Sequence, residues 1–295
     1  MKATFLDDRG VVQVSGDDAR KFLNGLFTTD VTRLTPGEAR FGALLTPQGK
    51  IVVDFLVAQV SPSAEGGERF LLDCPRALAQ ALSDKLNVYK LRAKVTVGNL
   101  SDKVGVIAVW DGAIGATPEP SFTDPRHENL GARVIASQGS LQDIAAALGA
   151  ELVGTHAYEA HRIDCSVPRG GLDFMYGDAF PHETNMDRLH GVDIGKGCYV
   201  GQEVVSRMHH RGTTRTRSAQ VLLEGASPEP GTPITAGDKT IGTMGSAAQH
   251  KGMALLRIDR AAEAMEAGTP LTAGGLVLRI ADPEALQGTP KQTVA

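Results

Sequence analysis

The residues best suited to chemistry lie in one short run, Lys196 to Glu203, with the sequence KGCYVGQE. This cysteine motif contains a thiol (Cys198), an ammonium, a phenol, an amide and a carboxylate, and its glycines let the backbone approach a ligand closely. The apolar spacing of residues 202–211 predicts a helix directly after the motif. A thiol that lies just before a helix N-terminus and close to Lys196 is favoured as the nucleophilic thiolate. The motif therefore predicts a reactive cysteine, and the alternative is a turn around a buried structural cysteine.

A basic run follows the motif, and it comprises Arg207, Arg211, Arg215 and Arg217 with His209 and His210 among them. Arginine suits carboxylates, so Arg207 is a candidate contact for an anionic ligand. A solvated helix face, or a hinge with salt bridges to the C-terminal domain, fits equally well. Adjacent histidines point about 100° apart on a helix, so we expect no metal there. The net charge of −4 and the lack of interleaved aromatic residues argue against nucleic acid as a partner.

Length and composition indicate a globular protein of two or three domains, with 295 residues and 42% hydrophobic side chains. Three cysteines with no C-x-x-C pair suggest a reducing compartment, and they are too few to hold an iron–sulfur cluster alone. The longest apolar runs are too short to cross a bilayer, so no membrane association is expected. The N-terminus passes directly into an alternating strand pattern without a targeting helix. These features predict a cytoplasmic location.

The order of the expected elements predicts an α+β fold. Residues 3–6 and 10–14 are expected to form paired strands, a helix follows at 19–27, and residues 40–60 form a long hairpin. Residues 111–130 lack periodicity and are expected to be a surface loop without chemistry. After Arg217 the chain turns to short strands separated by Gly and Pro, which is typical of a small antiparallel β-barrel. We expect a domain over 1–217, either undivided or with two subdomains, a barrel over 218–288 and a frayed tail over 289–295.

The cysteine motif matches the K-G-C-[FY]-x-G-Q-E signature of the YgfZ-type folate-binding proteins, relatives of the glycine-cleavage T-protein. Segments 16–23, 29–31, 162–173 and 180–185 also resemble this family, so the resemblance covers most of the first 217 residues. It implies antiparallel strand–helix units of the T-protein kind, followed by a barrel. It also implies that the protein binds tetrahydrofolate or a derivative and helps to assemble or repair iron–sulfur proteins. Its partners would then be folate and iron–sulfur client or assembly proteins.

The resemblance also implies a set of ligand contacts. Glu183 matches the carboxylate that accepts hydrogen bonds from the pterin ring in T-protein relatives, and the alternative is a solvated loop carboxylate. Arg92 lies in a segment that resembles the wall of the family's cavity, where it would position a carboxylate or cap a helix. Tyr199 and Gln202 of the motif complete the expected folate contacts with Arg207, and Cys198 with Lys196 forms the expected reactive pair.

The carboxylate that T-protein uses for aminomethyl transfer has no clear counterpart in this chain. Asp73 is the nearest candidate, and residues 74–83 contain no Asp or Glu. This difference favours an assembly factor over a folate-dependent aminomethyltransferase, which remains the alternative, and a non-catalytic folate sensor is a third possibility. On the favoured hypothesis Cys198→Ser is damaging and Asp73→Asn has little effect.

Overall fold

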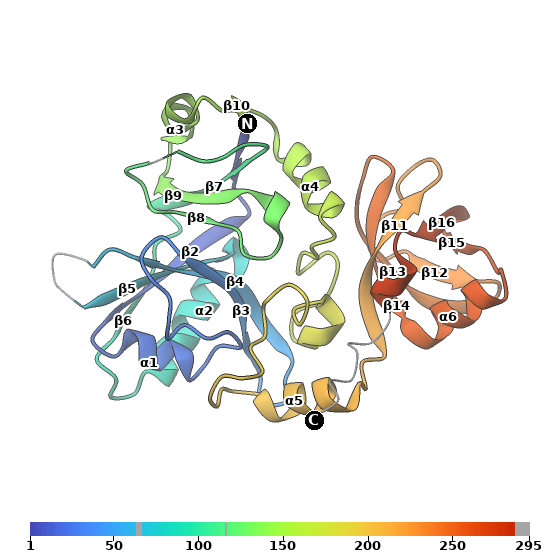
Figure 1. Ribbon diagram of the computed structural model, residues 1–295, viewed down its shortest axis with the longest axis horizontal. Coiled ribbons are helices and arrows are strands. Elements are labelled where there is room, and N and C mark those ends of the chain that lie inside the picture. The colour runs from blue at the N-terminus through green and yellow to red at the C-terminus, as the bar shows by residue number, and fades with distance from the viewer. Residues whose placement is uncertain (63–66, 116, 287–295) are drawn as a thin grey trace. The chain divides into compact units, whose positions relative to one another are not determined.

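The computed structural model describes residues 1–62, 67–115 and 117–286, which form two compact units (Figure 1). The first unit comprises Met1–Leu45, Val52–Tyr158 and Leu189–Val200. The second comprises Thr46–Ile51, Glu159–Arg188 and the described residues from Gly201 onward. No helix in these ranges is both long and apolar enough to pass through a bilayer.

One sheet of the first unit has the strand order β3-β4-β5-β2-β6. Its strands are β3 (Ala39–Leu45), β4 (Ile51–Val60), β5 (Glu68–Pro75), β2 (Arg9–Gly16) and β6 (Thr96–Asn99). Helices α1 (Ala19–Asn24) and α2 (Arg76–Tyr89) pack against it. Helix α2 begins directly after Pro75, which cannot continue a strand ladder, and it buries Ala79, Leu82 and Leu86 at helical spacing.

The other sheet of the first unit has the order β10-β1-β7-β9-β8. Its strands are β10 (Glu151–Leu152), β1 (Lys2–Leu6), β7 (Val104–Trp110), β9 (Ala132–Ser137) and β8 (Ser121–Thr123), with the short helix η1 (Glu128–Leu130) and helix α3 (Leu141–Leu148) beside them. The expected pairing of residues 3–6 with 10–14 is wrong, because β1 pairs with β7 while β2 pairs with β5. The expected surface loop at 111–130 is also wrong in part, since it contains β8 and buries Asp124 and Arg126.

A buried ionic cluster joins the two sheets of the first unit. Arg9 of β2 donates from Nε to Asp73 Oδ1 at 2.6 Å, and both residues lie in the first sheet. Arg133 of β9 donates to Asp124 at 3.1 Å, and its Nε lies 3.9 Å from Asp73 Oδ2. Arg126 pairs with the same Asp124 at 2.6 Å and holds the pKa of that carboxyl well below its usual range, against the opposing effect of burial. Asp73 therefore belongs to the scaffold.

The second unit contains a closed antiparallel barrel in the order β11-β14-β13-β12-β15-β16. Its strands are β11 (Thr216–Leu223), β14 (Lys251–Arg257), β13 (Lys239–Ala248), β12 (Pro233–Ala236), β15 (Leu271–Ala273) and β16 (Leu276–Ile280), with α6 (Ile258–Glu266) and η3 (Pro283–Leu286) beside them. Alternate residues such as Val221, Leu223 and Leu256 fill its core. Helix α4 (Thr155–Asp164) spans the boundary between the two units in sequence, and η2 (Pro181–Thr184) and α5 (Gln202–Arg211) belong to the second.

This architecture confirms the expected fold class, an α+β region followed by a small antiparallel barrel. The barrel was predictable because a series of short strands with Gly and Pro between them can pair all its edges by closing into a barrel. The domain limits at residues 217 and 288 stay predictions. The expected tail over 289–295 lies outside the described residues.

Candidate functional site

The ammonium of Lys196 is a structural anchor in the first unit. It donates to three backbone carbonyl oxygens, those of Asn24 at 2.7 Å, Phe27 at 2.6 Å and Thr29 at 2.9 Å. An ammonium has three donors, so each is used. Burial lowers the pKa of Lys196 to about 8, while nearby Asp30 and Asp193 oppose that change. Lys196 thus fixes the cysteine motif rather than offering a free charge.

Residues 189–200, here called the anchor loop, are attached to the same turn by further bonds. Thr28 donates from its hydroxyl to the carbonyl of Gly191 at 2.6 Å, and the amide of Asp193 donates to the carbonyl of Thr28 at 2.9 Å. The Thr28 hydroxyl also accepts from the amide of Ala43 in β3. A loop without regular secondary structure is therefore held by side chains to the edge strand of a sheet.

Cys198 lies on this loop with an exposed thiol. The other two cysteines, Cys74 and Cys165, are buried, and burial raises the pKa of Cys74 to about 12. Tyr199 next to Cys198 turns inward, and its ring centroid lies 5.2 Å from Lys196 Nζ. Burial raises the pKa of the Tyr199 phenol. Of the three thiols, Cys198 alone is accessible to a partner or a ligand.

Asp30 is a residue of this region that the sequence reasoning did not choose as a site residue. Its carboxylate accepts from the Thr32 hydroxyl at 2.6 Å and the Thr32 amide at 2.7 Å. These bonds lower the pKa of Asp30, and the charges of Lys196 and Arg40 add to the effect. The signal in the sequence was its place in Thr29-Asp30-Val31, which was used for the resemblance alone.

The cysteine motif passes from the first unit to the second at Val200–Gly201. Gly201 has φ +81°, a conformation that favours glycine, and α5 begins at Gln202 as expected. In α5, Glu203 and Arg207 form an ion pair one helical turn apart, with both side chains exposed. Such a pair contributes little to stability, but it occupies Arg207 with a neighbour of its own helix.

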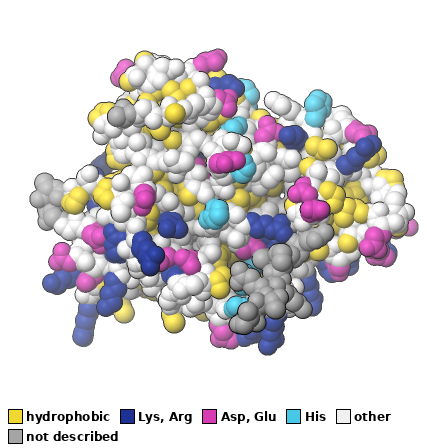
Figure 2. Space-filling model, viewed as in Figure 1, with side chains coloured by type: hydrophobic (Ala, Val, Ile, Leu, Met, Phe, Trp, Pro, Cys, Tyr) yellow, Lys and Arg dark blue, Asp and Glu magenta, His cyan; other side chains and the backbone are white. Residues whose placement is uncertain are grey.

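The remaining basic residues have different roles in the second unit. Arg217 is fully buried and donates to Asn185 at 3.0 Å and to Asp187 at 3.1 Å, so it is structural. Arg211 and Arg215 are exposed. On the face drawn in Figure 2, Lys and Arg side chains alternate with Asp and Glu among the described residues. This mixture gives no continuous basic surface there.

Glu183 lies in η2 and has a half-buried carboxylate. Its Oε2 accepts from the amide of Phe180 at 2.8 Å, which closes the start of the short helix. Burial raises the pKa of Glu183, while the Phe180 amide and the charge of Lys50 oppose that effect. Lys50 itself lies 3.6 Å from the centroid of the Phe180 ring. The carboxylate is thus fixed in place, with Oε1 free of hydrogen bonds to the described chain.

Arg92 follows the end of α2 and is exposed, with no hydrogen bond or ion pair to any residue in 1–62, 67–115 or 117–286. It therefore does not cap the helix carbonyls. The structure brings Lys196, Cys198 and Tyr199 together in the first unit. Glu183, Gln202 and Arg207 belong to the second unit. Residues 1–62, 67–115 and 117–286 contain no group of three or more metal ligands close enough to hold an ion.

His182 of η2 is buried, and neither ring nitrogen has a partner in the described chain. Burial lowers the pKa of His182 from 6.5 to about 4; His209 and Arg217 add to this, while Asp187 opposes it. Between these values the unfolded chain binds a proton that the folded chain does not, so stability falls as the pH drops from about 6.5 to 4. The expected loss is about 3 kcal/mol.

We expect His182→Gln to flatten this pH dependence and the exposed His210→Gln to leave it unchanged. The measurement is urea unfolding of the three proteins at several pH values between about 4 and 7. An equally steep decline in His182→Gln and the parent would show that other groups cause it.

The fold defines a class of protein related to aminomethyltransferases. A family model described as the GCVT N-terminal domain matches residues 7–112, and one described as the CAF17 C-terminal β-barrel domain matches residues 215–287. The chain resembles the crystal structure of glycine cleavage system aminomethyltransferase T from Bartonella henselae with a TM-score of 0.74. The superposition covers 97% of this chain and 87% of the Bartonella chain. At 16% identity that likeness shows the fold alone.

The chain belongs to the family of IBA57 iron–sulfur cluster assembly factors. It is 32% identical to the mitochondrial IBA57 of Mus musculus and 31% identical to that of Homo sapiens; each alignment covers 85% of this chain and 76% of the relative. It is 39% identical to the IBA57 homologue of Mycosarcoma maydis over 71% of this chain. The chain spans 54% of the length of that fungal relative.

These findings confirm the expected relation to an iron–sulfur assembly factor with an aminomethyltransferase fold. The narrower YgfZ-type assignment and the binding of folate stay predictions. The expected cytoplasmic location is wrong, because the relatives from fungi, mouse and human are named mitochondrial proteins. The alternation of apolar and polar residues near the N-terminus predicts the first strands of the sheets, and it carries no information about the compartment in which the protein works.

Proposed function

We propose that this protein helps to assemble or repair iron–sulfur proteins through the thiol of Cys198. The observation that carries the proposal is the exposure of this one thiol on a loop that Lys196 holds by three hydrogen bonds. A fixed loop presents the sulfur in one place, so a partner can meet it without ordering a flexible segment first. The printed names of the relatives, iron–sulfur cluster assembly factors, support the same process.

The chemistry open to Cys198 is ligand exchange on iron. The thiol loses its proton to solvent, a sulfur–iron bond forms, and another ligand of that iron leaves without electron transfer. Clusters are usually held by four thiolates, and one exposed cysteine supplies one. The cluster is therefore cargo that a client or assembly protein shares with Cys198. Lys196 acts as a positioning residue in this scheme, since its donors are occupied by backbone carbonyls.

We further propose that the protein is of the YgfZ type and binds tetrahydrofolate or a derivative, with Glu183 as the pterin contact. A carboxylate with one oxygen fixed by a backbone amide is preorganised to accept hydrogen bonds from an aminopyrimidine edge. Gln202, whose side-chain amide can donate and accept hydrogen bonds, is the second candidate contact for the folate. Arg207, Tyr199 and Arg92 are weaker candidates: Arg207 pairs with Glu203, Tyr199 is buried, and Arg92 is in solvent.

The folate proposal predicts that tetrahydrofolate raises the melting temperature of the parent protein, because a ligand of the native state shifts unfolding by mass action. Glu183→Ala is expected to weaken binding at least about 10-fold, since it removes a charged acceptor. Each variant is compared with its own ligand-free melting temperature, because the substitution also removes the Phe180 contact.

Asp178→Asn serves as the control for this experiment. Asp178 is an exposed carboxylate of the same unit, five residues before Glu183, and its loss should leave folate binding unchanged. If Glu183→Ala binds tetrahydrofolate as tightly as the parent, the pterin does not contact Glu183. If the parent itself shows no shift, the folate proposal fails while the role of Cys198 still stands.

A further inference from the structure

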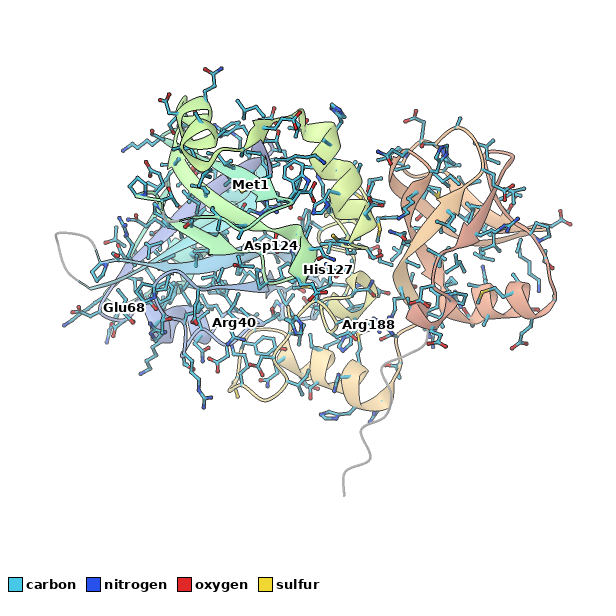
Figure 3. The ribbon with its side chains drawn as sticks, turned by 45° about the horizontal axis from the view of Figure 1, so that its top comes forward. Met1, Arg40, Glu68, Asp124, His127 and Arg188 are labelled. Atoms are coloured by element: carbon cyan, nitrogen blue, oxygen red, sulfur yellow. The ribbon has the colours of Figure 1, made fainter. Side chains whose placement is uncertain are left out.

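A surface pocket of about 410 Å³ lies in the first unit, apart from the thiol. Three chain segments line it: residues 37–40 at the start of β3, Thr123 with Pro125 on either side of Asp124, and His190 at the start of the anchor loop. Arg40 and Asp124 are labelled in Figure 3. The volume suits a small molecule. No part of the function proposed above uses this pocket.

Two opposite charges face this pocket without neutralising each other. The amide of Gly37 donates to the carbonyl of Gln59, and the amide of Gln59 donates to the carbonyl of Glu38. Gly37 itself lies in a turn with φ +89°, and the chain continues from Glu38 into β3. Side chains two residues apart on an extended chain point to the same side, which places Glu38 and Arg40 together. Both are exposed, and no ion pair joins them. Arg40 has no hydrogen bond or ion pair with any described residue.

The rest of the pocket is built to stay in place. Glu38 accepts from the amide of Thr35 at 3.1 Å through Oε2, which leaves Oε1 for a ligand. Asp124, between the lining residues Thr123 and Pro125, is buried and paired with Arg126 and Arg133, so it adds no net negative field. His190 holds φ +59°, a conformation that is costly for a residue with a side chain, and the carbonyl of the next residue is fixed by Thr28.

We propose that this pocket binds a small zwitterion of the α-amino acid type. The ligand's carboxylate would accept from the guanidinium of Arg40, and its ammonium would donate to the carboxylate of Glu38. The Thr123 hydroxyl and the His190 ring would contact the remainder of the ligand. A simple anion fits less well, because the carboxylate of Glu38 would repel it.

The test is direct binding of each standard amino acid to the full-length protein near neutral pH, by calorimetry. We expect at least one to bind with a dissociation constant of about 1 mM or tighter. For that amino acid, the analogue without the amine and the analogue without the carboxylate should each bind at least about 10-fold more weakly. Arg40→Gln and Glu38→Gln should each weaken binding of the intact amino acid by a similar factor.

Arg33→Gln is the matched control, because Arg33 is an exposed arginine of the neighbouring turn that does not line the pocket. The exchanged pair Glu38→Arg with Arg40→Glu should recover part of the binding lost in either single reversal, which a purely structural role would not produce. The proposal is overturned if no amino acid binds, or if Arg40→Gln binds as the parent does. It is also overturned if Glu38→Gln binds the amino acid at least as tightly as the parent does, and the parent binds the amine-free analogue at least as tightly as the amino acid. The site would then be one for anions.

Discussion

Replacing Cys198 by serine is expected to abolish the support of iron–sulfur enzymes in a cell that lacks this protein. Serine keeps the size and a hydrogen bond, but its hydroxyl is not ionised at neutral pH and is a poor ligand for iron in a cluster. Because the thiol is exposed, the substitution should not disturb packing, and protein abundance should stay at the parent level. The measurement is the activity of an iron–sulfur enzyme in extracts, which should fall to that of cells without the protein.

Cys165→Ala is the control for this prediction. Its thiol is buried, so the variant should be less stable but should still support the enzymes at a temperature where it is folded. Normal enzyme activity in cells that carry Cys198→Ser, at equal abundance, would exclude Cys198 as the working group. That result would favour the alternative hypothesis, in which the protein transfers aminomethyl groups.

Asp73→Asn is expected to destabilise the first unit by about 3 kcal/mol. The sequence alone predicted little effect, because an assembly factor does not need the transferase carboxylate for which Asp73 is the nearest candidate. The structure changes that expectation: Asp73 is fully buried and bonds to Arg9, with Arg133 close by. An uncharged amide leaves the guanidinium of Arg9 in a buried place without its counter-ion.

Urea unfolding of purified protein measures this loss, and Asp102→Asn is the comparison. Asp102 forms an ion pair with Arg76 at 3.1 Å, but its side chain is 98% exposed, so its substitution should cost less than about 1 kcal/mol. Reduced abundance with Asp73→Asn in cells would follow from the lost stability, and it would not be evidence for a catalytic acid. Equal stability of the two variants would mean that the buried cluster contributes nothing.

Features that depend on a pattern within one element could be predicted from the sequence. Pairings between distant elements could not. Helix α2 and the barrel followed from local periodicity and turn residues. The partners of β1 and β2 did not, because alternation tells which face is buried and not which strand lies alongside. Segment 121–130 lacks periodicity and was therefore expected to be a loop, but it buries Asp124 and Arg126, which pair with each other, and Asp124 also pairs with Arg133.

The candidate site shows the same division. The motif predicted the exposed thiol and the start of α5 at Gln202. It also suggested that Lys196 assists Cys198, because a positive charge close to a thiol favours the thiolate and the two residues are neighbours in sequence. Its actual partners are carbonyls 167 to 172 residues away, and no spacing in the sequence encodes them.

The anchoring by Lys196 affects how loss-of-function variants in this motif should be interpreted. A variant at Lys196 would remove three of the hydrogen bonds that hold the anchor loop to the turn at residues 24–29 and leave three carbonyls unsatisfied. Its defect would then depend on growth temperature, and it would be open to rescue by conditions that stabilise the fold. A defect at Cys198 would show neither property. Growth at different temperatures therefore distinguishes variants that misplace the thiol from variants that lack it.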